Sequence, residues 1–185
     1  MPTAREIAGR SGLDVDALVE ALSAAARAEL RALYRYTVLS SGPLAFAGEG
    51  LRQVLEDIRG EVRRHFEALA RRVCELEGAF PASAGRFLGE AGDAVLEELL
   101  SGGRDPAAVL AGAAAADAAP YAALCELTEG RDVWTYELVA AVRHEKLEHE
   151  AWLREIAGLG PPGRFQRGFR GRSPYLSRLP GPQGA

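Results

Sequence analysis

Apolar residues recur every three or four positions along most of this chain and divide it into long amphipathic segments. This spacing places the apolar side chains on one face of a helix. No useful stretch alternates with period two, so we expect no β-sheet. The pattern predicts four long helices, at about 15–39, 51–77, 107–128 and 132–157.

Capping residues and breakers agree with these bounds. Asp14 is a plausible cap for the first helix, and the Ser-Ser-Gly-Pro run at 40–43 ends it. A crossover at 78–106, with a short helix at about 94–100, separates the second and third long helices, and a further short helix is expected at about 4–9. Short, long and short connections predict an all-α four-helix bundle with one long crossover.

Composition supports one globular domain at 1–162, followed by a basic tail at 163–185. Apolar residues make up 48% of the chain and charged residues 26%, as in ordinary globular proteins. We expect no membrane-spanning segment and no signal peptide, and hence a cytoplasmic protein. Cys74 and Cys125 match no zinc or disulfide framework, so we expect them to be buried free thiols.

The charge is unevenly distributed. The net charge is −4, but the tail carries five arginines and no acidic residue, which leaves about −9 on the body. The tail could pack against a neighbouring subunit, or it could contact nucleic-acid phosphates, although the acidic body repels DNA. The arginines are Arg164, Arg167, Arg170, Arg172 and Arg178.

A Glu-to-His spacing of four residues occurs twice, in Glu61-Val-Arg-Arg-His65 and in Glu145-Lys-Leu-Glu-His149. Each pair falls on the apolar stripe of a long helix, and residues at this spacing share a helix face. Glu29, in the first long helix, also stands where an apolar residue is expected.

Buried carboxylates need a cation, a proton or a strong donor. A single His on an apolar face is usually an ordinary core residue, but paired Glu and His from two helices resemble the di-metal sites of four-helix bundles. Iron, manganese and zinc accept such ligands. The candidate metal ligands are Glu29, Glu61, His65, Asp117, Glu145 and His149. Tyr34, Tyr36 and Tyr121 are candidate hydrogen-bond partners for these carboxylates, or else plain aromatic core.

Several stretches carry a resemblance to a known family. The most specific is Glu-His-Glu-Ala-Trp at 148–152, which Gly-Pro-Pro-Gly-Arg-Phe at 160–165 follows. Further similar stretches lie at 12–19, 28–30, 34–39, 48–50, 65–78, 125–132, 135–139 and 173–177. With these motifs the chain resembles the Dps-like branch of the ferritin superfamily, also called thioferritins, over nearly its whole length.

The resemblance implies a ferritin-like bundle that assembles into a hollow shell of twelve subunits. It also implies oxidation of ferrous iron by peroxide or oxygen at a di-iron centre inside each bundle, with ferric mineral stored in the cavity. The family pattern places a carboxylate three residues before each His and another on the third helix. This chain has Val62, Lys146 and Ala114 at those positions, and Ala116 replaces the thiol that would pair with Cys125.

Three interpretations stay open. In the first, the metal site is lost, Lys146 neutralises Glu29, and the protein is a structural or DNA-binding shell subunit. In the second, the site is shifted by one position, with Glu61, Glu145 and Asp117 as replacement ligands of an active ferroxidase. In the third, other chemistry uses the alanine-rich third helix. An intact paralogue in a mixed cage would be a further source of iron chemistry.

Overall fold

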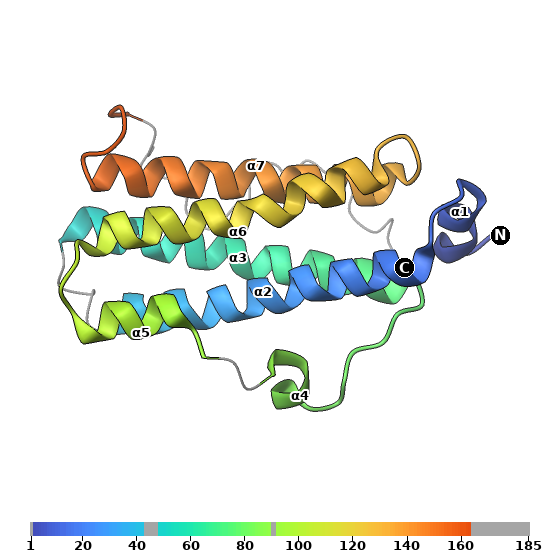
Figure 1. Cartoon of the computed structure of the whole chain (residues 1–185), viewed down its shortest axis with the longest axis horizontal. Coiled ribbons are helices and arrows are strands. Elements are labelled where there is room, and N and C mark those ends of the chain that lie inside the picture. Colours follow the sequence, from blue (N-terminus) through green and yellow to red (C-terminus); the bar gives the residue numbers. More distant parts are fainter. Residues whose placement is uncertain (1, 43–47, 90–91, 164–185) are drawn as a thin grey trace.

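Four long helices lie side by side in the computed structural model (Figure 1), which describes residues 2–42, 48–89 and 92–163. They are α2 (Val15–Ser41), α3 (Glu49–Glu75), α6 (Pro106–Thr128) and α7 (Val133–Ile156). Three short helices complete the described part of the chain: α1 (Ala4–Arg10), α4 (Ala84–Leu88) and α5 (Ala94–Ser101). The predicted all-α bundle is confirmed, with helix ends within two residues of those expected.

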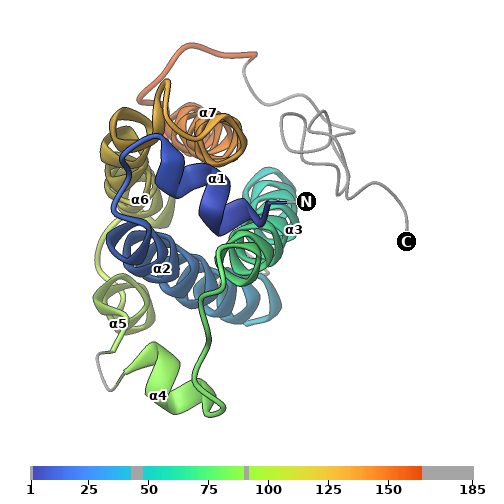
Figure 2. The ribbon, with the colours of Figure 1, turned by 90° about the vertical axis from the view of Figure 1, so that its right-hand side faces the viewer.

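The end view shows α2, α3, α6 and α7 around one core, with α1 across one end and α4 and α5 on the side of α2 (Figure 2). Local sequence explains the starts of the helices. Asp14 and Asp132 accept hydrogen bonds from the backbone N–H groups of Ala17 and Thr135 at the starts of α2 and α7. The sequence pattern missed α4, because five residues are too few to show a periodicity.

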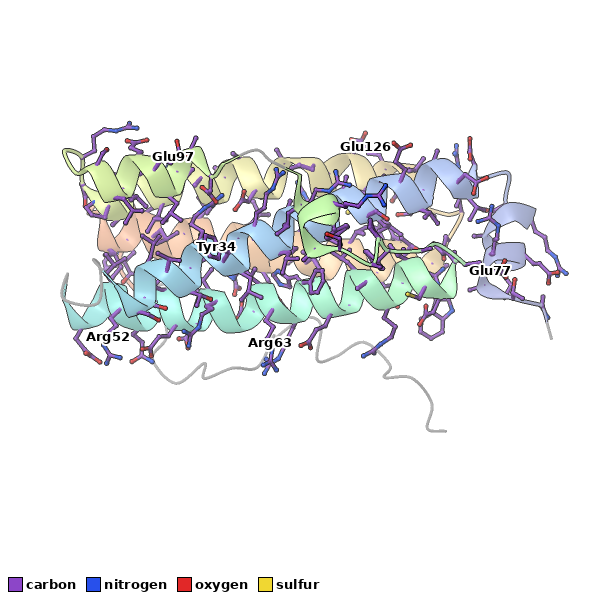
Figure 3. All side chains as sticks on the ribbon, turned by 90° about the horizontal axis from the view of Figure 1, so that it is seen from below. Tyr34, Arg52, Arg63, Glu77, Glu97 and Glu126 are labelled. Carbon is purple, nitrogen blue, oxygen red and sulfur yellow. The ribbon has the colours of Figure 1, made fainter. Side chains whose placement is uncertain are left out.

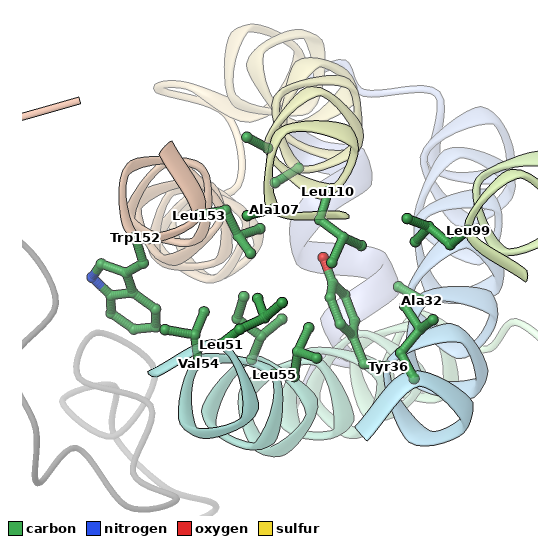
Figure 4. Packing of buried hydrophobic residues seen from close by; sticks show 14 of the residues in the cluster. Ala32, Tyr36, Leu51, Val54, Leu55, Leu99, Ala107, Leu110, Trp152 and Leu153 are labelled. Atoms are coloured by element: carbon green, nitrogen blue, oxygen red, sulfur yellow. The ribbon is translucent and has the colours of Figure 1, made fainter. Parts of the chain in front are cut away.

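The core consists of two apolar clusters, one towards each end of the bundle. One includes Tyr36, Leu110 and Trp152 (Figure 4), and the other includes Leu22, Leu69 and Leu138. The two clusters draw on successive stretches of the same four long helices. Buried polar residues on α2, α3 and α7 stand between those stretches, so a polar layer divides the core.

The outside of the bundle is largely charged, as the labelled side chains of Arg52, Arg63, Glu97 and Glu126 illustrate (Figure 3). Tyr34 is also exposed, so it is not a partner for buried carboxylates. Cys74 is exposed and Cys125 is partly exposed; both are free, and the prediction that they are buried is wrong.

Helix α6 differs from the other long helices. Its residues Gly112, Ala115, Ala116, Ala119 and Ala123 are exposed although they carry no charge. By length and composition α6 could cross a membrane, so the expectation that no stretch of the sequence is long and apolar enough to do so is wrong. One such helix is weak evidence, since a helix that packs within a bundle passes the same test.

Candidate functional site

The polar layer between the two apolar clusters holds most of the candidate ligands. Glu29 comes from α2, Glu61 and His65 from α3, and Glu145 and His149 from α7, and each is at most 1% exposed. The structure therefore brings five of the six predicted ligands into one layer. Two further residues join them: Lys146 on α7 and Tyr121 on α6.

The histidines are paired crosswise between α3 and α7. His65 Nε2 lies 2.7 Å from Glu145 Oε2, and His149 Nε2 lies 2.7 Å from Glu61 Oε2. Each His thus contacts the carboxylate that stands four residues before the other His. The two imidazole rings are stacked, with centroids 5.9 Å apart. The repeated sequence spacing produces an approximately symmetric pair of contacts.

His65 lies between two carboxylates, because its Nδ1 is 3.2 Å from Glu29 Oε2. Burial lowers the pKa of His65, but the hydrogen bonds to Glu145 and Glu29 outweigh it and raise the pKa above 6.5. Because both ring nitrogens face carboxylates, neither is free to ligate a metal ion in this arrangement.

Glu29 Oε1 has two more partners. Lys146 Nζ lies 2.8 Å from it, and the Tyr121 hydroxyl donates to it at 2.7 Å. Burial raises the pKa of Glu29, yet the charge of Lys146 and the hydrogen bond with His65 lower it to about 2. Glu29 is therefore ionised and fully paired.

The Glu61–His149 pair has a different electrostatic character. Burial and then the charge of Glu145 raise the pKa of Glu61 to about 8. Burial and then the charge of His65 lower the pKa of His149 well below 6.5. A protonated Glu61 can therefore donate to Nε2 of a neutral His149. Glu61 Oε1 has no hydrogen-bond partner among the described residues.

Asp117 lies apart from this layer. Its Oδ2 is 3.3 Å from Arg35 Nη1, and Arg35 Nε is 2.8 Å from Asp93 Oδ2 at the start of α5. The sequence analysis missed this bridge, although Arg35 precedes Tyr36 close to the apolar stripe of α2. Tyr36 itself is buried in the apolar cluster of Figure 4.

The side chains at the three departing positions do not fit a di-iron centre. Val62 and Ala114 pack in the apolar cluster that contains Leu110, and Lys146 places an ammonium group on Glu29. Across residues 2–42, 48–89 and 92–163, no group of three or more His, Cys, Asp or Glu side chains is arranged to hold a metal ion.

A four-helix bundle with one long crossover and a buried Glu–His layer defines the ferritin-like class of proteins. The chain is 39% identical over 182 residues to the DNA protection during starvation protein (Dps) of Pyrococcus furiosus, and the match covers 95% of each chain. The chain therefore belongs to the Dps family, a ferritin-like lineage of iron and oxidative-stress protection.

A solved structure has the same fold. It is described as a dodecameric thioferritin, the bacterioferritin-related protein of Bacteroides fragilis, and it is similar with a TM-score of 0.66 at 22% identity. The similarity covers 82% of this chain and 90% of that one. No family model matches the chain.

Proposed function

We propose that this protein is the subunit of a homo-oligomeric protective shell of twelve copies. The observation that carries the proposal is the end-to-end match to the Pyrococcus furiosus Dps, which covers the whole bundle and not one motif. The twelve-subunit state of the structurally similar thioferritin supports the stoichiometry.

The mass of the native particle tests this proposal. Light scattering after size exclusion should give about twelve times the subunit mass of 19.7 kDa, and negative-stain images should show hollow spheres. A monomer or dimer at micromolar concentration would contradict it.

Contact with DNA is a second candidate function. The tail beyond the described residues favours it, because it carries five arginines and no acidic residue. Arg164, Arg167, Arg170 and Arg172 would neutralise phosphates, and such binding weakens steeply with salt. The name of the Pyrococcus furiosus relative points the same way.

A mobility-shift titration with duplex DNA tests this role. The full chain should retard the DNA at low salt, and this shift should disappear as the salt concentration rises. A variant with those four arginines changed to Gln should give no shift. Keeping the tail length constant separates charge from assembly. An equal shift by both proteins would show that the tail is not the contact.

A shell that mixes this chain with an intact paralogue is the finer form of the shell proposal, and it would place iron oxidation on the partner subunit. Co-expression of the two chains with a tag on one would recover both in a single particle if they mix.

A cytoplasmic location remains a prediction.

A further inference from the structure

We infer that the ammonium group of Lys146 takes the place of a metal ion, so that the bundle centre is a metal-independent ion cluster and not a di-iron site. This inference rests on the contacts within one subunit and on membership of the Dps family. It does not depend on the number of subunits in the shell.

Lys146 stands at a position where the family pattern places a metal ligand. It stands three residues before His149, where the family pattern has a carboxylate, and its side chain is 2% exposed. Its Nζ lies 2.8 Å from Glu29 Oε1, so a monovalent cation already sits against the carboxylate that α2 would offer to a metal. The ammonium group would repel a divalent ion at that place, and this repulsion is strong in a low-dielectric core.

The remaining ligand atoms are engaged with one another. Both nitrogens of His65 contact carboxylates, and His149 Nε2 contacts Glu61. Glu29 lies against both Lys146 and His65, Glu145 lies against His65, and Glu61 lies against His149. The layer therefore satisfies nearly all of its charges internally, as buried ionic groups require.

Neighbouring positions could not complete a metal site. Val62 and Ala114 are 0% and 2% exposed and carry no donor atom. Even if Lys146 moved away, the pattern would lack three of its six ligands. Glu61 Oε1, which has no hydrogen-bond partner among the described residues, is the acceptor that the alternative of a shifted site would use.

Thermal unfolding of the full-length protein, with EDTA or with added Mn²⁺ or Zn²⁺, tests the inference without any measurement of activity. The melting temperature of the wild type should change by less than about 2 °C between these conditions. A metal-dependent rise beyond that would overturn the inference and support the shifted site, because a ligand that binds only the folded state stabilises it.

Two substitutions at one position sharpen the test. Lys146→Met removes the cation and should lower the melting temperature by on the order of 10 °C, with no rescue by metal. Lys146→Glu should melt at least as low in EDTA, because it adds a buried negative charge. Any rise in melting temperature with added Mn²⁺ should be confined to this variant, because it alone places a carboxylate at position 146.

Either variant would overturn the inference by keeping the wild-type melting temperature in EDTA, since Lys146 would then not compensate the layer. A Lys146→Met protein whose melting temperature rises with added Mn²⁺ would also count against it, because the remaining side chains would then bind metal. If the variants do not fold, the wild-type arm still decides, because it needs no substitution.

Discussion

At the scale of single residues, the polar layer combines ion pairs with a neutral pair. Glu29 is held ionised by Lys146 and His65, whereas Glu61 is held protonated by burial, although both are glutamates in the same layer. The difference arises because the cations lie on the Glu29 side and because Glu145 faces Glu61 with a like charge.

This difference predicts a pH dependence of stability. Folding raises the pKa of Glu61 from 4.5 to about 8, so the folded state holds a proton that the unfolded state has lost between these values. The free energy of unfolding contributed by Glu61 therefore decreases as pH rises through this window. His149, whose pKa is lowered by folding, acts in the opposite direction, but only below about pH 6.5.

Urea unfolding of wild type and Glu61→Gln at pH 6.5, 7 and 8 measures the effect of Glu61. The wild type should lose stability relative to the variant as pH rises, because Gln does not titrate. Glu20→Gln, a change at an exposed position, is the control and should leave the pH profile unchanged. Parallel profiles for wild type and Glu61→Gln would show that Glu61 is ionised in the folded protein.

At the scale of helices, buried arginines join segments that are distant in sequence. Arg35 joins α2 to Asp93 at the start of α5 and to Asp117 on α6. Arg72, near the end of α3, donates to Thr135 Oγ1 and to Asp132 Oδ2, each at 2.8 Å, at the start of α7. Such contacts fix where the loops leave the bundle.

Loss of the Arg72 contacts should destabilise the bundle. Arg72→Met leaves the buried Asp132 without a cationic partner, which typically costs about 3–5 kcal/mol and, in a chain of this size, lowers the melting temperature by roughly 6–20 °C. Arg71→Met, at the neighbouring exposed position, is the matched control and should melt like the wild type. Equal melting temperatures for the two variants would show that the buried pair contributes nothing.

The helices were predictable, and so were the contacts of Lys146 and Tyr121 with Glu29, but the pairing of the two histidines was not. Apolar stripes define α2, α3, α6 and α7, and caps mark the starts of α2, α6 and α7. The same stripes predict that Glu29, Glu61 and Glu145 are buried, because helix faces follow from local spacing. The crosswise pairing of the two histidines depends on how α3 and α7 pack, which spacing on one helix does not determine. Asp117 satisfied the same stripe rule, yet Arg35 from α2 pairs with it outside the layer.

At the scale of the whole molecule, the fold of the Dps family is kept while the centre of its bundle has changed. The two apolar clusters support the bundle at both ends, and the ion cluster between them needs no added charge. We therefore expect the proposed shell to assemble without iron at the centre of its subunits. Any iron chemistry of the particle would then depend on other surfaces or on a partner subunit.

The most direct test of this account is the iron content of the assembled wild-type protein after aerobic loading with ferrous iron and desalting. The account predicts close to zero iron per chain, with the particle mass unchanged by loading. About two irons per chain, the occupancy of a di-iron centre, would contradict it and favour the shifted site, with Glu61, Glu145 and the two histidines as ligands despite Lys146.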